Sequence, residues 1–189
     1  VASGTGDIAK LFSRKNNHLS EITCVEPNNE MFEEGKKNLK KLKNINWIKS
    51  QAEKLPLKDN TYDYYSISYG IRNVSDINKA LKEAHRVLKP GGMLLAVFPQ
   101  HLQPFESHLN FVTNLPCLHW FFNSNKISEK YFEILNERGD GAKWYRGEKN
   151  NLEKWEKLPT LNGTSIRKFE KILKINKWND IKWIKRPIL

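Results

Sequence analysis

The stretch Val1-Ala2-Ser3-Gly4-Thr5-Gly6-Asp7-Ile8-Ala9 decides the fold, because it has the pattern of a strand end, a tight turn and a helix start. Gly4 and Gly6 are separated by a single residue, and glycine permits the positive φ that lets a ligand lie against the backbone. The helix behind the turn offers unpaired backbone N–H groups at its N-terminus. The stretch therefore predicts a site for a nucleotide-like cofactor without identifying the cofactor.

The chain after this turn alternates short apolar runs with amphipathic segments. Strands are expected at 22–25, 45–48, 64–68 and 93–98, and helices at 8–15, at about 29–43 and at 76–88, with a sharp turn at 89–92. Because each strand is a continuous apolar run, the alternation indicates an α/β fold of Rossmann-like type, with a parallel sheet and helices on both faces. A helix at 165–177 and a strand at 180–184 are expected to close the fold.

Residues 99–160 interrupt this alternation. They are rich in aromatic residues, with a helix expected at about 127–135 and a polar loop at 136–151, and they show no core pattern of their own. We therefore expect a single domain over residues 1–189, in which residues 99–160 form an inserted lid over the substrate, before the last helix–strand unit. The glycine turn comes too early for a full preceding strand, so we expect the chain to be incomplete, and we expect the same at its other end.

Composition narrows the class of protein. The chain is 39% hydrophobic and has no apolar run long enough to span a membrane, which argues against disorder and against a transmembrane segment. Its two cysteines suggest neither a disulfide framework nor a zinc site, and the three histidines at 101, 108 and 119 lack metal-site spacing, so we expect a cytoplasmic protein without a metal. The net charge of +11 is concentrated in residues 143–189, which would suit RNA or an anionic membrane face, although solvated helix faces explain it more simply.

Glu26 follows the strand at 22–25 and stands where a ribose-binding acid is needed. A glycine turn with an acid at this spacing serves both NAD and S-adenosylmethionine, so this pair of features leaves an NAD-dependent oxidoreductase open.

Strings further along the chain resemble the class I S-adenosylmethionine-dependent methyltransferases, and within them the ubiquinone/menaquinone biosynthesis C-methyltransferases. The resemblance covers residues 1–98 and includes Ala52-Glu53-Lys54-Leu55-Pro56, Gly70-Ile71-Arg72-Asn73 and Arg86-Val87-Leu88-Lys89-Pro90-Gly91-Gly92. It implies that S-adenosylmethionine is the cofactor and that it is bound by Ser3, Gly4, Gly6, Asp7, Glu26, Pro27, Met31, Gln51, Ala52, Ser68 and Tyr69.

The resemblance also implies a role for several of these side chains. Glu26 would accept both ribose hydroxyls, and Gln51 would reach the adenine amino group from a position where the family usually has Asp or Asn. Met31 would pack on the adenine face, with burial in the helix core as the alternative interpretation.

The reaction implied is methyl transfer to a small molecule, with the ring carbon of a quinone precursor as the leading acceptor. Arg72 is the candidate for stabilising the phenolate form of the acceptor, in which this carbon is nucleophilic. Alternatively, Arg72 is a structural loop arginine that bonds backbone carbonyls. His101 is the candidate base, or else a polar lining residue. The aromatic residues of the lid favour an apolar or aromatic acceptor. O-methylation of a sugar-like or other hydroxylated metabolite, and RNA binding or RNA methylation through the basic tail, are the alternatives.

Overall fold

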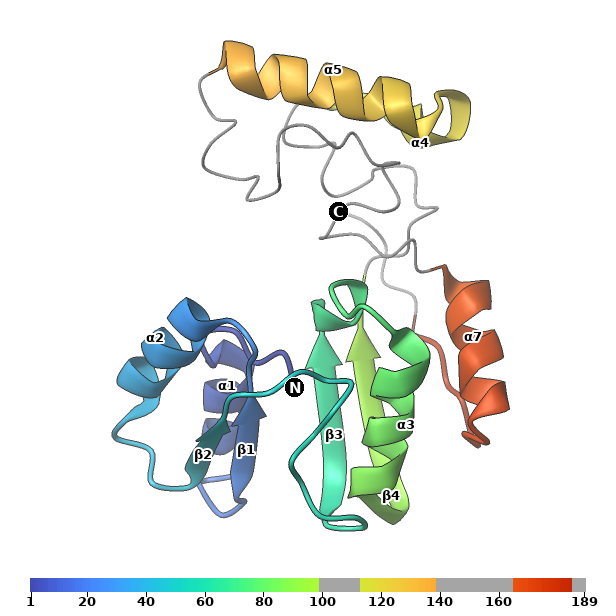
Figure 1. Ribbon diagram of the computed structural model, residues 1–189. Helices are drawn as coiled ribbons and strands as arrows, with labels where there is room; N and C mark the ends of the chain where they lie inside the picture. Colours follow the sequence, from blue (N-terminus) through green and yellow to red (C-terminus); the bar gives the residue numbers. More distant parts are fainter. Residues whose placement is uncertain (99–112, 139–164, 185–189) are drawn as a thin grey trace.

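The computed structural model of the chain describes residues 1–98, 113–138 and 165–184 (Figure 1). The elements of these residues, in chain order, are α1 (Asp7–Lys15), β1 (Ile22–Val25), α2 (Asn29–Leu39), β2 (Ile45–Ile48), β3 (Tyr62–Ser68), the 3-10 turn η1 (Gly70–Arg72), α3 (Ile77–Val87), β4 (Leu88–Val97), α4 (Leu118–Phe121), α5 (Ser124–Glu137) and α7 (Ile166–Ile175). Each strand and helix expected between residues 1 and 98 is therefore present.

The strands form two parallel pairs, β1 with β2 and β3 with β4. Residues 1–3 join the pairs, because the backbone nitrogen of Val1 donates to the Ser66 carbonyl of β3 (2.7 Å) and the Ser3 N–H donates to the Val25 carbonyl of β1 (3.1 Å). The order across the molecule is thus β2, β1, residues 1–3, β3 and β4. The chain that leads into the glycine turn lies at the centre of this arrangement.

Helices cover this parallel arrangement on both faces, as expected for the α/β class. Figure 1 shows α3 in front of β4, α7 beside α3, and α1 behind β1. The main core contains buried residues of β3, α3 and α7, among them Ile67, Leu81 and Phe169. A smaller core around Cys24 and Leu39 joins α1 and α2 to β1 and β2. The two cores fix the positions of the loops that follow the strands.

Trp47 explains a glycine in the middle of α2. A Cβ on Gly35 would overlap the Trp47 ring, so only glycine lets this helix approach β2. Phe32 meets the same ring edge-on, with 5.8 Å between the ring centroids. The close approach packs the middle of α2 against β2.

Several of the expected boundaries differ in the structure, three of them for a clear physical reason. Residues 89–92 were expected as a turn before the strand, and they bulge out within β4, since Leu88 pairs with Tyr62 and Met93 already pairs with Tyr64. Helix α2 ends at Leu39 instead of near residue 43, because the chain turns there and the Leu42 N–H donates to the Leu39 carbonyl. Helix α5 begins at Ser124, earlier than expected, because the Asn123 side chain caps it through the Lys126 N–H (3.0 Å).

The strand expected at 180–184 is wrong. Residues 181–184 have no regular structure, and no strand among residues 1–98, 113–138 and 165–184 pairs with them. Ile181 packs against the main core and the ring centroid of Trp183 lies 6.2 Å from that of Phe169, while Ile184 is 86% exposed. Packing of Ile181 and Trp183 thus accounts for the apolar alternation that the sequence pattern attributed to a strand.

None of the helices in the described residues is long and apolar enough to cross a membrane.

Candidate functional site

The glycine turn leaves an open face on the backbone. Gly4 has φ of 54° and Gly6 has φ of 87°, both in the left-handed region that favours glycine. A Cβ added to Gly4 would meet nothing within 4 Å, whereas one on Gly6 would lie 2.6 Å from Leu39 Cδ1. Gly4 therefore offers space for a ligand against its backbone, and Gly6 is also required by the packing of α2.

Helix α1 begins directly at this turn. Gly6 is its N-cap and supplies no capping side chain, while exposed Asp7 stands in the first turn and accepts a hydrogen bond from Thr5 Oγ1 (2.9 Å). The first N–H groups of a helix lack partners within the helix, so the turn presents hydrogen-bond donors beside the carboxylate of Asp7.

Glu26 joins the glycine turn to the start of α2. The side chain is only 4% exposed, and its Oε2 accepts from the Gly4 N–H (2.8 Å) while its Oε1 accepts from the Asn28 N–H (3.0 Å). A carboxylate has about four lone-pair sites, so each oxygen keeps one for a further donor such as a ribose hydroxyl. The sequence predicts Glu26 as a ligand-binding acid, and the structure adds that it holds the glycine turn in place.

The other predicted residues near β1 differ in their surroundings. Ser3 Oγ accepts from the Val25 N–H (3.1 Å), so this hydroxyl bonds to β1, and Pro27 is exposed. Met31 lies in the first turn of α2 and is 48% exposed. The alternative of Met31 as a core residue is therefore wrong, whereas its packing on an adenine ring stays a prediction.

Gln51 and Ala52 follow β2 in the loop that leads to β3. Gln51 is exposed and Ala52 is 5% exposed within the main core. Buried Ala52 fixes the backbone of the loop, while the Gln51 side chain is available to a ligand.

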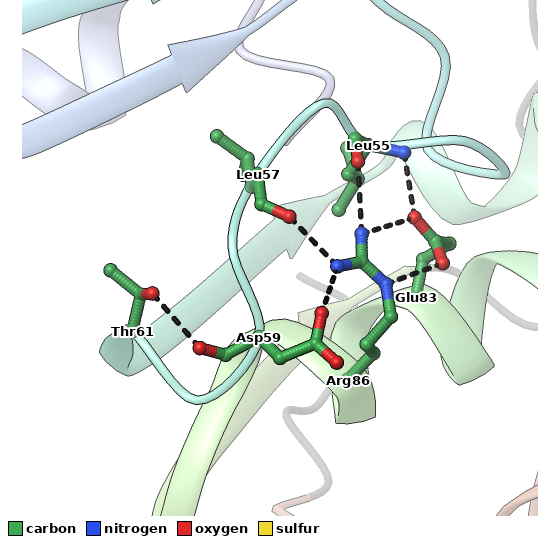
Figure 2. A network of polar contacts seen from close by, with 6 residues as sticks. All are labelled: Leu55, Leu57, Asp59, Thr61, Glu83 and Arg86. Carbon is green, nitrogen blue, oxygen red and sulfur yellow. Dashed lines mark hydrogen bonds and ion pairs between the residues drawn. The ribbon is translucent and has the colours of Figure 1, made fainter.

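A polar network holds the continuation of this loop on α3 (Figure 2). Arg86 donates to the carbonyls of Leu55 (2.9 Å) and Leu57 (2.7 Å) and to Asp59 Oδ1 (2.6 Å). Glu83 pairs with Arg86 (2.7 Å) and accepts from the Leu55 N–H (2.7 Å). Hydrogen bonding to the guanidinium of Arg86 lowers the pKa of Glu83. This network was not predicted from the sequence, although an acid and an arginine three residues apart on a helix are a recognisable signal.

The segment after β3 turns sharply at the end of the sheet. Tyr69 has φ of 59° and is 62% exposed, and its N–H donates to the Val97 carbonyl of β4 (2.6 Å). A Cβ on Gly70 would overlap the side chain of Ala2, so this segment touches the chain that enters the glycine turn. Ser68 is half-buried at the end of β3, and Arg72, in η1, is only 8% exposed.

The predicted cofactor residues therefore stand at the carboxyl ends of neighbouring parallel strands, where open α/β sheets bind ligands. Direct hydrogen bonds join the glycine turn to Glu26 and Ser3 to β1. The burial of Arg72 is compatible with both of its predicted roles, and His101 lies outside the described residues. The described residues contain no group of three metal-ligating side chains.

Comparisons with known sequences identify relatives of the chain. The sequence model of the ubiE/COQ5 methyltransferase family matches residues 1–122. A Rickettsia felis protein named ubiquinone/menaquinone biosynthesis C-methyltransferase UbiE is 46% identical over 143 residues, which are 69% of this chain and 57% of that protein. The protein of the same name from Rickettsia prowazekii is 49% identical over 104 residues, or 51% of this chain and 42% of that protein. The chain thus spans about half the length of these relatives.

Solved structures support the fold. The YcgJ protein of Bacillus subtilis matches with a TM-score of 0.58 at 20% identity, covering 93% of this chain and 58% of that one. A SAM-dependent methyltransferase of Aquifex aeolicus matches with a TM-score of 0.52 at 22% identity, covering 73% of this chain and 68% of that one. The Rossmann-like methyltransferase fold expected from the sequence is confirmed.

Proposed function

Because the chain belongs to the ubiE/COQ5 methyltransferase family, we propose that it binds S-adenosylmethionine and takes part in methylating a small molecule, with a ring carbon of a quinone precursor as the acceptor. The observation that carries this proposal is the hydrogen bond from the Gly4 N–H to buried Glu26. This bond brings the open backbone face at Gly4 next to a carboxylate whose oxygens each keep a lone pair for a further donor. These features fit the methionine and ribose parts of the cofactor. The relatives provide no support for O-methylation or for an RNA substrate.

Residues of three loops would bind different parts of the cofactor. Gly4 and Gly6 accommodate the amino-acid part, with Asp7 as the partner of its ammonium group, and Glu26 accepts the ribose hydroxyls. Gln51 and the Ala52 N–H are assigned to the adenine ring.

S-adenosylmethionine, when bound, would supply an electrophilic methyl group carried on its sulfonium. The residues of the chain contribute mainly alignment and exclusion of water. Arg72 would stabilise the phenolate form of the acceptor, and His101 would take the phenolic proton whose loss makes the ring carbon nucleophilic. The hydrogen on the methylated ring carbon then leaves as a proton when the ring becomes aromatic again, which re-forms the phenol. Ser68 and Tyr69, at the end of β3, line the space between cofactor and acceptor.

We also propose that residues 99–160 cover the acceptor within a single domain. In the described part of this segment, Trp120, Phe121 and Phe122 are 51%, 79% and 53% exposed. Exposed aromatic side chains of this kind suit an apolar or aromatic acceptor. Replacing Phe121 by serine should raise the KM for such an acceptor and leave cofactor affinity unchanged.

Titrating S-adenosylmethionine and NADH separately against tryptophan fluorescence tests the cofactor. We expect saturable binding of S-adenosylmethionine alone, and binding of NADH alone would overturn the proposal. Transfer of a labelled methyl group to demethylated quinols, with catechols and sugars as competing acceptors, tests the acceptor class. Label on the catechol or sugar oxygen and none on the quinol carbon would refute the C-methylation assignment.

A further inference from the structure

We propose that Glu53 is a positioning residue, which fixes the loop carrying Gln51 and Ala52 and thereby sets how selectively the adenine end of the cofactor is recognised. This inference rests on the proposed function, because it assumes that the adenine ring binds at Gln51. Glu53 itself touches neither cofactor nor acceptor in this scheme and acts through its neighbours.

Glu53 binds the start of α3 from a distant part of the chain. Its Oε1 accepts from the Ser75 N–H (2.7 Å), from Ser75 Oγ (2.9 Å) and from the Asp76 N–H (3.3 Å). Backbone N–H groups at a helix start lack partners within the helix and favour a negative charge. Helix α3 already has a local cap, since Asp76 Oδ1 accepts from the Lys79 N–H (3.0 Å). Asp76 therefore caps α3 locally, and the bonds from Ser75 and Asp76 to Glu53 are additional to this cap.

The rest of the loop is held independently. Leu55, two residues beyond Glu53, is 4% exposed, and Glu83 and Arg86 bind its backbone from the other end of α3 (Figure 2). Loss of the Glu53 contact would leave the loop anchored at Leu55, at buried Ala52 and by the bonds of Ser50 Oγ to the Lys54 carbonyl (2.6 Å) and of the Lys54 N–H to the Gln51 carbonyl (3.3 Å). It would free the part before Leu55 from α3. That part contains Gln51, which is separated from Glu53 by Ala52 alone.

The same contact connects two sides of the site. Ser75 lies three residues after Arg72, in the segment that follows β3. Glu53 thus ties the loop after β2 to the loop after β3, and the position of the adenine-side residues depends on the start of α3.

The test compares two ligands that differ along one edge of the purine ring. S-adenosylhomocysteine carries an amino group at position 6 and an acceptor at N1, whereas S-inosylhomocysteine carries a carbonyl oxygen and an N1–H donor there. Isothermal titration of both ligands gives a ratio of dissociation constants that reports recognition of this edge of the adenine ring. In Glu53→Ala we expect this ratio to fall about tenfold, the scale of one lost hydrogen bond, mainly through weaker binding of S-adenosylhomocysteine. Glu53→Gln keeps a carbonyl acceptor for Ser75 and should restore most of the ratio.

Asp76→Ala is the matched control, because it removes a cap from the same helix start without touching the loop. It should lower the Tm and leave the ratio unchanged. Gln51→Ala should reduce the ratio as far as Glu53→Ala does, and the double variant should reduce it no further, as expected for residues that act as one unit.

An unchanged ratio in Glu53→Ala, or an equal fall in Asp76→Ala, would overturn the inference while leaving cofactor binding intact. If the unaltered protein binds neither ligand, the proposed function fails and the inference fails with it.

Discussion

Replacing Glu26 by alanine should weaken both the fold and cofactor binding. The substitution leaves the N–H groups of Gly4 and Asn28 without their shared acceptor, and a hydrogen bond to a charged group contributes about 1.5–3 kcal/mol. Water can reach the open face at Gly4 and replace part of this loss, so we expect the free energy of unfolding to fall by about 2–4 kcal/mol. The loss of a partner for the ribose hydroxyls should weaken S-adenosylmethionine binding by about 1–3 kcal/mol, roughly five- to 150-fold.

Urea unfolding followed by tryptophan fluorescence measures the first quantity, and isothermal titration of S-adenosylmethionine measures the second. Glu33→Ala is the control, since it removes the same charge from an exposed position of α2 whose carboxylate lies 3.9 Å from Lys36 Nζ. An affinity for S-adenosylmethionine equal to that of the control would show that the ribose binds elsewhere. An unfolding free energy equal to that of the control would refute the role of Glu26 in holding the glycine turn.

Three further experiments test the packing and the electrostatics of the described residues. Gly70→Ala should lower the free energy of unfolding by about 1–3 kcal/mol, because the added methyl group overlaps the side chain of Ala2. Adding Ala2→Gly to this variant should recover part of the lost stability. A Gly70→Ala variant as stable in urea as the unaltered protein would contradict the close contact. Because Arg86 lowers the pKa of Glu83, this carboxylate stabilises the fold above about pH 4.5 and loses that effect as the pH falls through the lowered value. Glu83→Gln should therefore flatten the acid side of the stability–pH curve, and an unchanged curve would count against the pair. Burial raises the pKa of the Cys24 thiol, so alkylation of Cys24 at pH 8 should be slow until the chain unfolds. Rapid labelling of Cys24 in the folded protein would disprove the burial of this thiol.

Local chemistry explains why much of the fold was predictable. The runs 22–25 and 45–48 form strands whose apolar side chains are buried or half-buried. Asn28, Asp76 and Ser165 cap helices through their own side chains. These signals lie within a few residues of the structure that they specify. The strand expected at 180–184 failed because a strand also needs a partner at hydrogen-bonding distance, and that requirement is not encoded locally.

In the candidate site, too, some features were predictable from the sequence and others depended on tertiary packing. Residue type and spacing were enough to predict the glycine turn and the acid at position 26, and the family resemblance predicted S-adenosylmethionine as the cofactor. Only the tertiary structure decided that Glu26 holds the turn, that Met31 is exposed, and that Glu53 and the Glu83–Arg86 pair anchor the loop after β2. Each of these contacts depends on how separate segments pack, since the partners of Glu26 and Glu53 on other loops lie more than twenty residues away in the chain. Spacing along the sequence cannot show which of several acids meets an unpaired backbone N–H group.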